Sequence, residues 1–381
     1  MELVVRKADL LRELQLLQGI VERKITIPVL ANVLVEAGDN ELRLLATDLE
    51  VGLRSRCDAS VAKPGTVTIP AKKLFEIVRA LPETDVRIEE DKSGVRVAAD
   101  RFDSRLATLP AEDYPSLPVS ADDVGETLGS AGLRQMVGKT QFAITGEDTR
   151  YFLNGGLLVL KAGAMSLVAT DGHRLALVSV NRGSDAGTKE GGTGGGEDKG
   201  GEEIKVILPK KTLSELGRLL AESDADVRFV RSENHLFFSV GGRLLISRVI
   251  DGQFPAYDRV VPKSNDKRIE FDRDRLTSAV RRVALLSNER SRAVKFQMDP
   301  GQVEVTSSSP EIGDARELLM VDYTGPSMQI CFNAQYVLDF LNAVETEQVA
   351  LEFKDDVSQA VMRPIGAEGY EYTYVIMPMR L

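Results

Sequence analysis

Residues 169–177, ATDGHRLAL, lie near the middle of the 381-residue chain and contain one of its two histidines. The first half of this stretch recurs as ATDLEVGL at residues 46–53, and a looser version, VTSSSPEIG, occupies residues 305–313. Each version follows a short apolar run typical of a strand, namely LRLL, MSLV and QVEV. The stretch, called the marker below, therefore indicates an internal repeat before it indicates an active site.

Outward from the marker, one order of elements occurs three times: a helix, several strands, a second helix and further strands. The residues LPKKTLSELGRLL of the second copy match IPAKKLFEIVRAL of the first almost position for position. Apolar residues at helical spacing predict six helices, at residues 6–24, 71–80, 130–141, 210–220, 272–286 and 333–344. The copies predict three domains, at residues 1–121, 122–262 and 263–381.

The second copy is longer than the first. From Thr170 to Leu208 the spacing is 38 residues, against 22 from Thr47 to Ile69, and the glycine-rich residues 183–201 account for the difference. This segment lacks the GxxxxGK[ST] order of a phosphate-binding loop and precedes a strand, whereas such a loop precedes a helix. We expect a disordered surface insertion.

Composition excludes several classes of protein. No run approaches the roughly 18 apolar residues that a membrane helix needs, and the first ten residues do not resemble a signal peptide, so a cytoplasmic protein without a membrane partner is expected. Cys57 and Cys331 match no paired-ligand spacing. We expect two reduced, buried thiols and neither a metal site nor a cofactor.

Charge is unevenly distributed along the chain. The net charge is −10, which taken alone argues against a nucleic-acid partner. The six predicted helices nevertheless hold 17 Lys and Arg against 8 Asp and Glu, so they carry +9 and the remainder carries −19. If the helices share a face, that face is basic and suits a polyanion, although ordinary solubilising residues explain the count equally well. No base-reading motif occurs, so any nucleic-acid contact should be independent of sequence.

The whole chain resembles a known family, the bacterial sliding clamp, which is the beta subunit of DNA polymerase III. The resemblance is carried by IPVLANVLVE, TIPAKKLFEIVRALP, RYFLNGGLL, ATDGHRLAL, VIDGQFPAYDRVVP, FNAQYVLDFLNA and the ending YVIMPMRL. It implies an α+β fold of three clamp domains, each with two helices packed on antiparallel sheet. It also implies a head-to-tail homodimer that closes a ring around duplex DNA, with the helices lining the hole.

The family implies a non-catalytic processivity factor that tethers the replicative polymerase. Other polymerases, the clamp-loader ATPase and repair proteins would bind the same hydrophobic groove through short peptides, whose polar ends arginines and Asn333 can hold. The matching groove positions are Leu153, Thr170, Gly172, His173, Arg174, Leu175, Pro255, Arg259, Val260, Asn333, Tyr336, Val357, Val375, Ile376, Met377, Pro378, Met379, Arg380 and Leu381.

DNA contacts are predicted on two grounds. The resemblance points to Lys24, Arg150, Tyr151 and Phe152. Charge alone points to the basic helix residues Arg79, Arg134, Lys139, Lys210, Lys211, Arg218, Arg281 and Arg282.

At the dimer interface, Leu285 and Leu286 match apolar family positions, and Leu106 lies on a strand expected to pair across it. The neighbouring Arg105 and Arg101 are hypothesised to face Glu304, Glu311 or Glu317 of a second subunit.

Two other functions compete with a clamp. A scaffold that binds proteins and never surrounds DNA would agree with the acidic total. A hydrolase could use Asp171 and His173 with Ser179 nearby in sequence, but a catalytic dyad needs a nucleophile in reach and an oxyanion site, and the sequence indicates neither.

Overall fold

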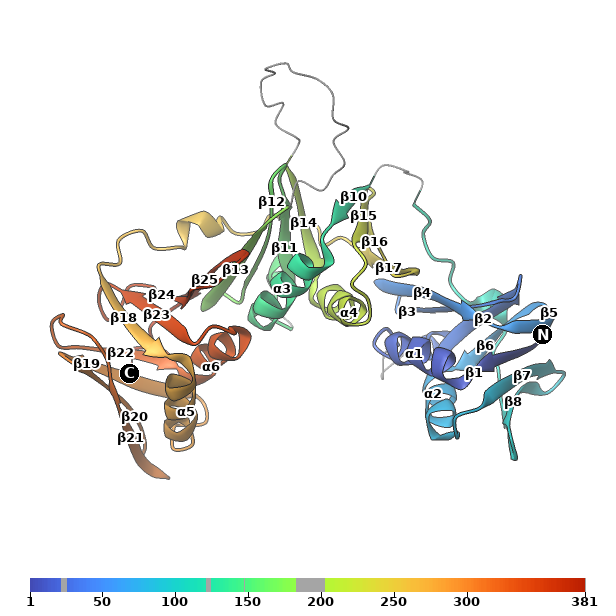
Figure 1. Cartoon of the computed structure of the whole chain (residues 1–381), viewed down its shortest axis with the longest axis horizontal. Helices are drawn as coiled ribbons and strands as arrows, with labels where there is room; N and C mark the ends of the chain where they lie inside the picture. The colour runs from blue at the N-terminus through green and yellow to red at the C-terminus, as the bar shows by residue number, and fades with distance from the viewer. Residues whose placement is uncertain (22–25, 121–124, 147, 183–202, 381) are drawn as a thin grey trace, which may run out of the picture. The chain divides into compact units, whose positions relative to one another are not determined.

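The fold is α+β, and all the described strand pairs are antiparallel. The structure is a computed structural model that describes residues 1–21, 26–120, 125–146, 148–182 and 203–380. The order of elements repeats three times as a strand, a helix, several strands, a second helix and three strands. The copies run from β1 to β9, from β10 to β17 and from β18 to β25, which confirms the threefold plan (Figure 1). Predictions for Lys24, Leu381 and the insertion at 183–201 lie outside the described residues.

Contacts divide the chain into two compact units. Unit 1 comprises Met1–Ala131 and Lys211–Val249, and unit 2 comprises Gly132–Lys210 and Ile250–Leu381. The division passes through the second copy because its strands pair with both neighbouring copies. Each unit therefore contains one junction between copies, and the three domain boundaries stay a prediction.

Unit 1 consists mainly of the first copy and the last strands of the second. Its elements are β1 (Glu2–Arg6), α1 (Lys7–Leu17), η1 (Pro28–Ala31), β2 (Asn32–Gly38), β3 (Glu41–Thr47), β4 (Val51–Asp58), β5 (Ser60–Lys63), β6 (Gly65–Pro70), α2 (Ala71–Ala80), β7 (Asp85–Asp91), β8 (Gly94–Ala99), β9 (Phe102–Leu106), η2 (Ala111–Asp113), β10 (Glu126–Leu128), most of α4 (Lys210–Ala221), β15 (Val227–Arg231), β16 (His235–Val240) and β17 (Arg243–Arg248).

These strands form two sheets. Sheet A has the order β5-β1-β7-β8-β9, and sheet B has the order β10-β15-β16-β17-β4-β3-β2-β6. The two copies meet in sheet B where β17 pairs with β4, with Leu245 opposite Leu53. A single hydrogen-bonded sheet thus joins residues that are almost 200 positions apart.

Unit 2 holds the other junction. Its elements are most of α3 (Ser130–Thr140), η3 (Gln141–Ala143), η4 (Tyr151–Leu153), β11 (Gly155–Leu160), β12 (Ala164–Thr170), β13 (Arg174–Asn181), β14 (Ile204–Pro209), η5 (Tyr257–Arg259), β18 (Lys267–Asp272), α5 (Arg273–Ala284), β19 (Ala293–Asp299), β20 (Gln302–Ser309), β21 (Gly313–Met320), β22 (Met328–Asn333), α6 (Ala334–Ala343), β23 (Gln348–Phe353), β24 (Ala360–Ile365) and β25 (Tyr370–Ile376).

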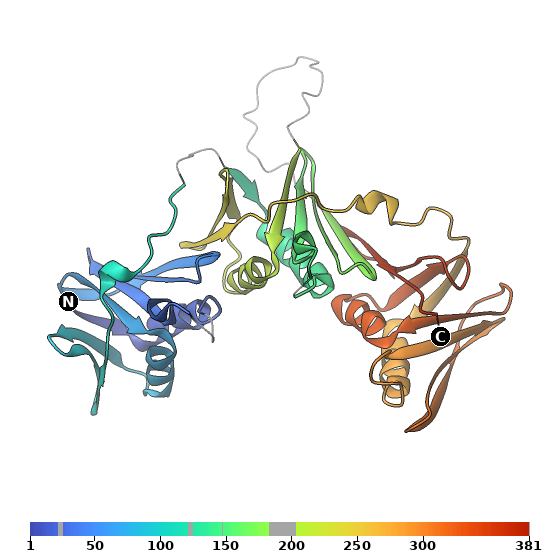
Figure 2. The same ribbon diagram turned by 180° about the vertical axis from the view of Figure 1, so that it is seen from behind.

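Sheet C has the order β14-β11-β12-β13-β25-β24-β23-β18, and sheet D has the order β21-β20-β19-β22. Here the junction is the pairing of β13 with β25. In both junctions, the strand that follows the marker pairs with the last strand of the next copy. Figure 2 shows the chain after β17 running on across sheet C towards η5 on the face away from the helices.

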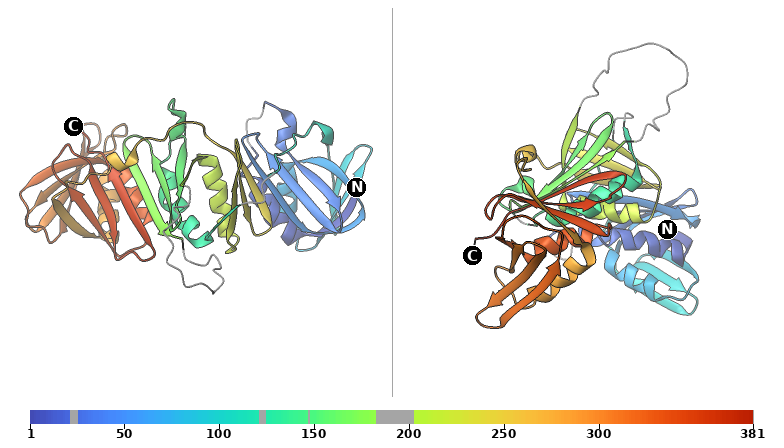
Figure 3. Two further views of the ribbon diagram at one scale, coloured as in Figure 1. Left: turned by 90° about the horizontal axis from the view of Figure 1, so that it is seen from above. Right: turned by 60° about the vertical axis from the view of Figure 1, so that its left-hand side comes forward.

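Within each unit the helices pack against one face of the sheets, as the further views in Figure 3 show. The sequence pattern explains this arrangement. In α2, Leu74 and Val78 are one turn apart and fully buried, whereas Lys73 and Glu76 are exposed and paired. Five of the six predicted helices agree with the structure to within two residues at each end.

Two expectations require correction. The first helix ends at Leu17 instead of residue 24, because the chain leaves the helix at Gln18 and Gly19 follows. In the third copy, Thr306 was aligned with Thr47 and Thr170, but it lies inside β20, and the turn follows only after Ser309. The third marker is therefore a longer hairpin of a different kind.

A buried ion pair joins the copies in unit 1. Two guanidinium nitrogens of Arg243 in β17 donate to the Glu13 carboxylate of α1 at 2.7 and 2.8 Å. The side chains are 8% and 1% exposed, so neither charge has water to stabilise it if the other is removed. The pair therefore holds α1 in a fixed position on sheet B.

Replacing Arg243 by leucine should lower the free energy of unfolding of unit 1 by about 3 kcal/mol, because the Glu13 charge would be left buried with only the half-exposed Arg12, 3.1 Å away, to balance it. Urea unfolding followed by circular dichroism measures the change. Arg96→Leu is a matched control in the same unit, since Arg96 forms two ion pairs at 44% exposure and should cost about 1 kcal/mol or less. The double variant Glu13→Leu, Arg243→Leu should recover most of the loss; equal losses for Arg243→Leu and Arg96→Leu would contradict the buried-charge explanation.

Candidate functional site

The marker of the second copy forms the turn between β12 and β13. The Thr170 hydroxyl donates to the carbonyl of Arg174 at 2.6 Å and accepts the Gly172 amide at 3.1 Å. The Asp171 carboxylate accepts the amides of His173 and Arg174 at 2.9 and 3.0 Å. Thr and Asp are therefore turn-forming residues here.

The marker of the first copy folds in the same way between β3 and β4. The Thr47 hydroxyl donates to Val51 and accepts the Leu49 amide, each at 3.0 Å, and Asp48 accepts the amides of Glu50 and Val51. The third position is left-handed in both turns, with φ of 78° at Leu49 and 88° at Gly172. This shared geometry explains why the sequence ATD recurs.

The hydrolase hypothesis gains no geometric support at this turn. Asp171 uses its carboxylate for two backbone amides and for the guanidinium of Arg174, and His173 is exposed. The Ser179 hydroxyl lies 2.8 Å from that of Ser166, farther along the sheet. Asp171 therefore has a structural role.

Arg174 is held on the helix face of sheet C, meaning the face that α3 and α6 contact. Its guanidinium donates to Asp171 at 3.0 Å, to the carbonyl of Phe142 at 2.7 Å and to Asp339 of α6. It also lies 4.3 Å from the centre of the Tyr336 ring. Burial disfavours its charge, but Tyr374 and Asp339 more than compensate, so the pKa of Arg174 is raised above the ordinary value.

On the opposite, outer face of sheet C lies an apolar cluster. Leu175 of β13 and Val375 of β25 face each other in register, and both are buried. Phe254 and its neighbours from residues 250–261 cover them. The buried members are Leu157, Val159, Val168, Leu175, Ile207, Phe254, Val361 and Val375, and Phe152, Leu177, Ile250, Tyr257, Val260 and Val261 are partly buried against them.

The end of β25 lies between two turns. Ile376 is opposite Arg174 on one side and Ala360 on the other, so the marker turn and the β23–β24 turn both flank the point where the tail begins. The Met377 amide then donates to His173 at 3.0 Å, and the Met379 amide donates to Cys331 of β22 at 2.8 Å. Two apolar side chains remain exposed here, Val357 at 50% and Met377 at 37%.

The structure thus brings most predicted groove residues together around the start of β13 and the end of β25. Arg174 and Asn333 are exceptions to their expected role in holding the polar ends of a peptide. Arg174 is engaged as described, and the Asn333 side chain caps α6 by accepting two backbone amides. Arg259 and Arg380 are exposed and better placed for that task. Leu153, Thr170, Leu175, Val375 and Ile376 are buried beneath the surface.

Two lysines predicted to contact DNA are engaged inside the protein. Lys139 is 4% exposed, and its ammonium lies 4.9 Å from the centre of the Tyr370 ring. Burial lowers the pKa of Lys139. Lys211 donates to the carbonyl of Ile20 at 2.8 Å and pairs with Asp48. Counting helix charges could not reveal these interactions, and both lysines are better explained as structural cations.

The remaining basic helix residues reach the surface. Arg79, Arg134, Lys210, Arg218, Arg281 and Arg282 are all exposed. The residues from the η4 region are placed differently, because the Arg150 guanidinium approaches Gly172 of the marker and Phe152 joins the outer apolar cluster. Arg150 also pairs with Asp148 at 2.8 Å, and Tyr151 is 58% exposed.

The predicted interface residues lie at two sheet edges. Arg105 and Leu106 belong to β9 at the edge of sheet A, where Arg105 pairs with Asp91 at 2.7 Å. Leu285, 78% exposed, and Leu286 follow α5 beside sheet D. Several further apolar side chains, not predicted from the sequence, are also unusually exposed here: Phe102 on β9, Leu318 and Met320 on β21, and Ile312 in the turn before β21. The sequence signal for the three strand residues is that apolar side chains share a strand with charged ones, such as Asp103 and Arg105 on β9.

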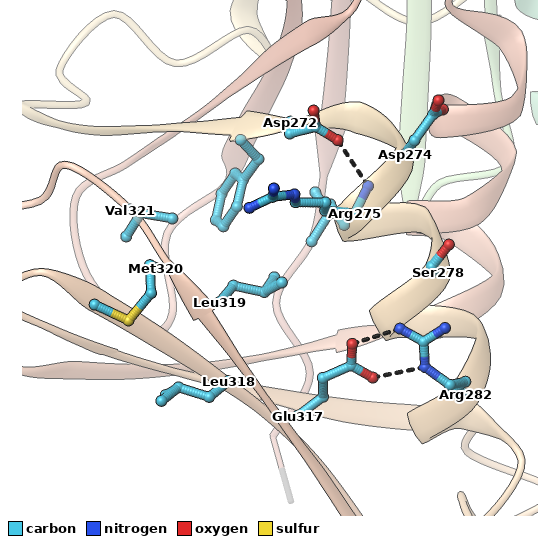
Figure 4. Close-up of a pocket in the computed structure, with 12 residues that line it drawn as sticks. Asp272, Asp274, Arg275, Ser278, Arg282, Glu317, Leu318, Leu319, Met320 and Val321 are labelled. Atoms are coloured by element: carbon cyan, nitrogen blue, oxygen red, sulfur yellow. Dashed lines mark hydrogen bonds and ion pairs between the residues drawn. The ribbon is translucent and has the colours of Figure 1, made fainter.

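A cavity of about 540 Å³ lies between α5 and β21 (Figure 4). Asp272 caps α5 by accepting the Arg275 amide at 2.8 Å, and Arg282 forms a bidentate pair with Glu317. The hypothesis that Glu317 faces an arginine of a second subunit is weakened, because Arg282 of the same chain already neutralises it.

Two other kinds of site were sought in the described residues. They contain no group of three His, Cys, Asp or Glu side chains suited to a metal ion. None of the helices described there is long and apolar enough to cross a membrane. Cys57 and Cys331 are free and buried, and burial raises the pKa of Cys57 to about 12.

Three family models match nearly the whole chain. They are the N-terminal domain of the DNA polymerase III beta subunit at residues 1–118, the central domain at 127–191 and 195–256, and the C-terminal domain at 258–380. The beta sliding clamps of Pseudomonas aeruginosa and Escherichia coli K12 are each 37% identical to it, over the full length of both proteins.

Solved structures agree with this assignment. The sliding clamp of P. aeruginosa bound to griselimycin matches with a TM-score of 0.89 at 36% identity, and the polymerase III beta subunit of Caulobacter crescentus matches with 0.87 at 36%. Both matches cover all of each chain. The chain therefore belongs to the family of bacterial beta sliding clamps, the beta subunits of DNA polymerase III.

Proposed function

We propose that the chain is a DNA polymerase processivity factor that works as a ring-shaped homodimer around duplex DNA in the cytoplasm. It has no catalytic activity of its own and slides without reading sequence. It keeps the replicative polymerase on its template by raising the polymerase's effective concentration there. The proposed domains are 1–121, 122–262 and 263–381.

The strongest support comes from two sheet edges. At both junctions within the chain, the strand after the marker pairs with the last strand of the next copy, as β4 does with β17 and β13 with β25. The corresponding strands left over are β21 of the third copy and β9 of the first, and in the described sheets each has a neighbour on one side only. Pairing β21 of one subunit with β9 of another would repeat the same junction.

Such a contact joins different surfaces of identical chains, so it produces either an open filament or a closed ring. Two chains with three copies each would close after six equivalent junctions. The exposed apolar residues support this contact, since Leu318 and Met320 lie on β21, Phe102 on β9 and Leu285 beside α5. Isolated apolar residues need no explanation, but a group along an unpaired strand edge indicates an interface.

The charge distribution supports contact with DNA. The exposed basic residues of the helices, among them Arg79, Arg134, Lys210 and Arg281, would line the hole, and the acidic remainder would face solvent. Few phosphates are neutralised at once by such a lining, so binding stays weak and salt-sensitive, which suits sliding.

We further propose that partners bind through short apolar peptides at the groove around Gly172, His173 and Met377. The partners would be the replicative polymerase, the clamp-loader ATPase, other polymerases and repair proteins. A polarisable methionine beside aliphatic side chains adapts to peptides of varied sequence. The alternative of a scaffold that never surrounds DNA shares the groove but needs no ring.

Encirclement predicts retention that depends on DNA topology. After loading with the clamp loader and ATP, most of the protein should stay on circular duplex DNA during gel filtration, and cutting the circle once should release it. Equal loss from circular and linear DNA would favour the scaffold.

Replacing Leu285 by aspartate should weaken the dimer about 100-fold or more, because a carboxylate would be buried in an apolar contact. Sedimentation equilibrium measures the dissociation constant. Val119→Asp is a closely matched control, since Val119 is 79% exposed and belongs to none of β9, α5 and β21. Leu285→Asp should leave the unfolding midpoint unchanged, and an unchanged dissociation constant would remove Leu285 from the interface.

Deleting residues 377–381 should weaken binding of a polymerase peptide at least about 100-fold, because it removes Met377 and the tail from the groove. Fluorescence anisotropy with a labelled peptide measures the loss, and sedimentation should show an intact dimer. Undiminished affinity after the deletion would refute the groove assignment.

A further inference from the structure

We propose that the outer face of sheet D binds an acidic extension of the partner peptides that occupy the groove. The proposal rests on the peptide-binding role given above and names a feature that selects among partners. Its ligand chemistry is a carboxylate-bearing stretch of polypeptide directly adjoining the apolar anchor.

Four residues lie side by side across the strands of sheet D. Cys331 of β22 pairs with Lys295 of β19, Lys295 pairs with Thr306 of β20, and Thr306 pairs with Arg316 of β21. Their neighbours Val294, Phe296 and Val305 are buried on the other face, which α5 covers. The alternation of strand side chains therefore puts Lys295, Thr306 and Arg316 together on the outer face.

A cavity of about 530 Å³ opens at this row. Lys295 and Arg316 line it together with the hydroxyl side chains of Ser291, Thr306 and Ser308. Within the described part of the chain, no ion pair or hydrogen bond occupies the side chain of Lys295 or of Arg316. Most other arginines and lysines on the sheets are paired with acids, as Arg96 and Arg268 are. Two unpaired cations beside hydroxyl donors suit a carboxylate ligand.

The row begins where the groove ends. The Met379 amide donates to the carbonyl of Cys331, so the tail that flanks the groove lies against the first member of the row. The positive charge of Lys295 also acts on the Cys331 thiol, partly offsetting the burial that raises the pKa of Cys331. From Cys331 to Arg316 the row crosses three strand spacings, about 14 Å, which an extended peptide covers in about four residues.

Acidic side chains near the row limit the ligand. Asp314 lines the cavity, and Glu304 lies on the same face of β20, so both would repel a ligand carboxylate that lay beside them. A ligand carboxylate is therefore attracted only where it lies directly between Lys295 and Arg316. Elsewhere the non-helical part of the chain is strongly acidic and would repel an acidic peptide. Lys295 and Arg316 are therefore the part of this face that can attract a carboxylate.

The test uses the full-length protein and two fluorescein-labelled peptides. One is a short uncharged peptide with leucine and phenylalanine anchors, and the other adds four Asp or Glu residues, made separately at each end. At low ionic strength, the better acidic peptide should bind the unmodified protein about threefold to tenfold more tightly than the uncharged one. This gain should fall as salt screens the charges.

In the double variant Lys295→Gln, Arg316→Gln the gain should disappear, and affinity for the uncharged peptide should not change. Because Arg316 lies on β21, the strand proposed to pair between subunits, sedimentation should also show that the variant keeps the dimer of the unmodified protein. Lys63→Gln with Lys92→Gln is the matched control, since both lysines are exposed in unit 1 and the change in net charge is the same. A gain that survives in the first variant, or is lost equally in the control, overturns the proposal.

Failure of the groove itself is distinguishable, because the uncharged peptide would then not bind the unmodified protein at all. Duplex DNA that displaces the acidic but not the uncharged peptide would assign the row to phosphate and would also overturn it.

Discussion

Strand pairing between copies is the constraint on which the rest of the structure depends. A β-strand edge must find a partner for its backbone groups, and here the strand after the marker and the last strand of a copy provide edges for each other. A buried cation then fixes a helix to each shared sheet: Arg243 binds Glu13 of α1 in unit 1, and Arg174 binds Asp339 of α6 in unit 2. The strand pairing is the same in both places, but the ion pairs are not equivalent. Arg243 is on the last strand of the second copy and binds a first helix, whereas Arg174 is on the strand after the marker and binds a second helix.

The two junctions, β17 with β4 and β13 with β25, have the same strand pairing but differ on the outer faces of their sheets. In the first, a Cβ atom on Gly52 would lie 2.8 Å from Leu117, so the chain's own leucine packs over the position after the marker turn. In the second, the matching residue is Leu175, and residues 250–261 cover the apolar cluster without enclosing Met377 and Val357. A groove for partners is consequently expected at one junction only, even though the marker occurs in both.

Sequence alone could predict those features that depend on local pattern. Apolar periodicity located α2 to α6, and the repeated ATD located two identical turns, because Thr and Asp bond to their own backbone. It could not predict tertiary partners. The sequence does not show that Lys139 lies over the Tyr370 ring or that Lys211 pairs with Asp48, so a charge count treats both as surface cations. The sequence likewise predicts that Arg174 binds a ligand, whereas its guanidinium donates to Asp171, Asp339 and the carbonyl of Phe142. The extended hairpin after Thr306 has no turn chemistry in common with the other markers, so alignment by residue type misplaced it.

The proposed ring would explain how one acidic chain can serve both DNA and protein partners. If contact with DNA depended on affinity, a net charge of −10 would oppose it, and adding enough cations to overcome that charge would slow sliding. Topological linkage removes the need for affinity, so only a modest basic lining is required on the helices. The rest of the chain can then keep its net negative charge. In that setting Lys295 and Arg316, which are unpaired among the described residues, would be free to act on the proposed partner polypeptides.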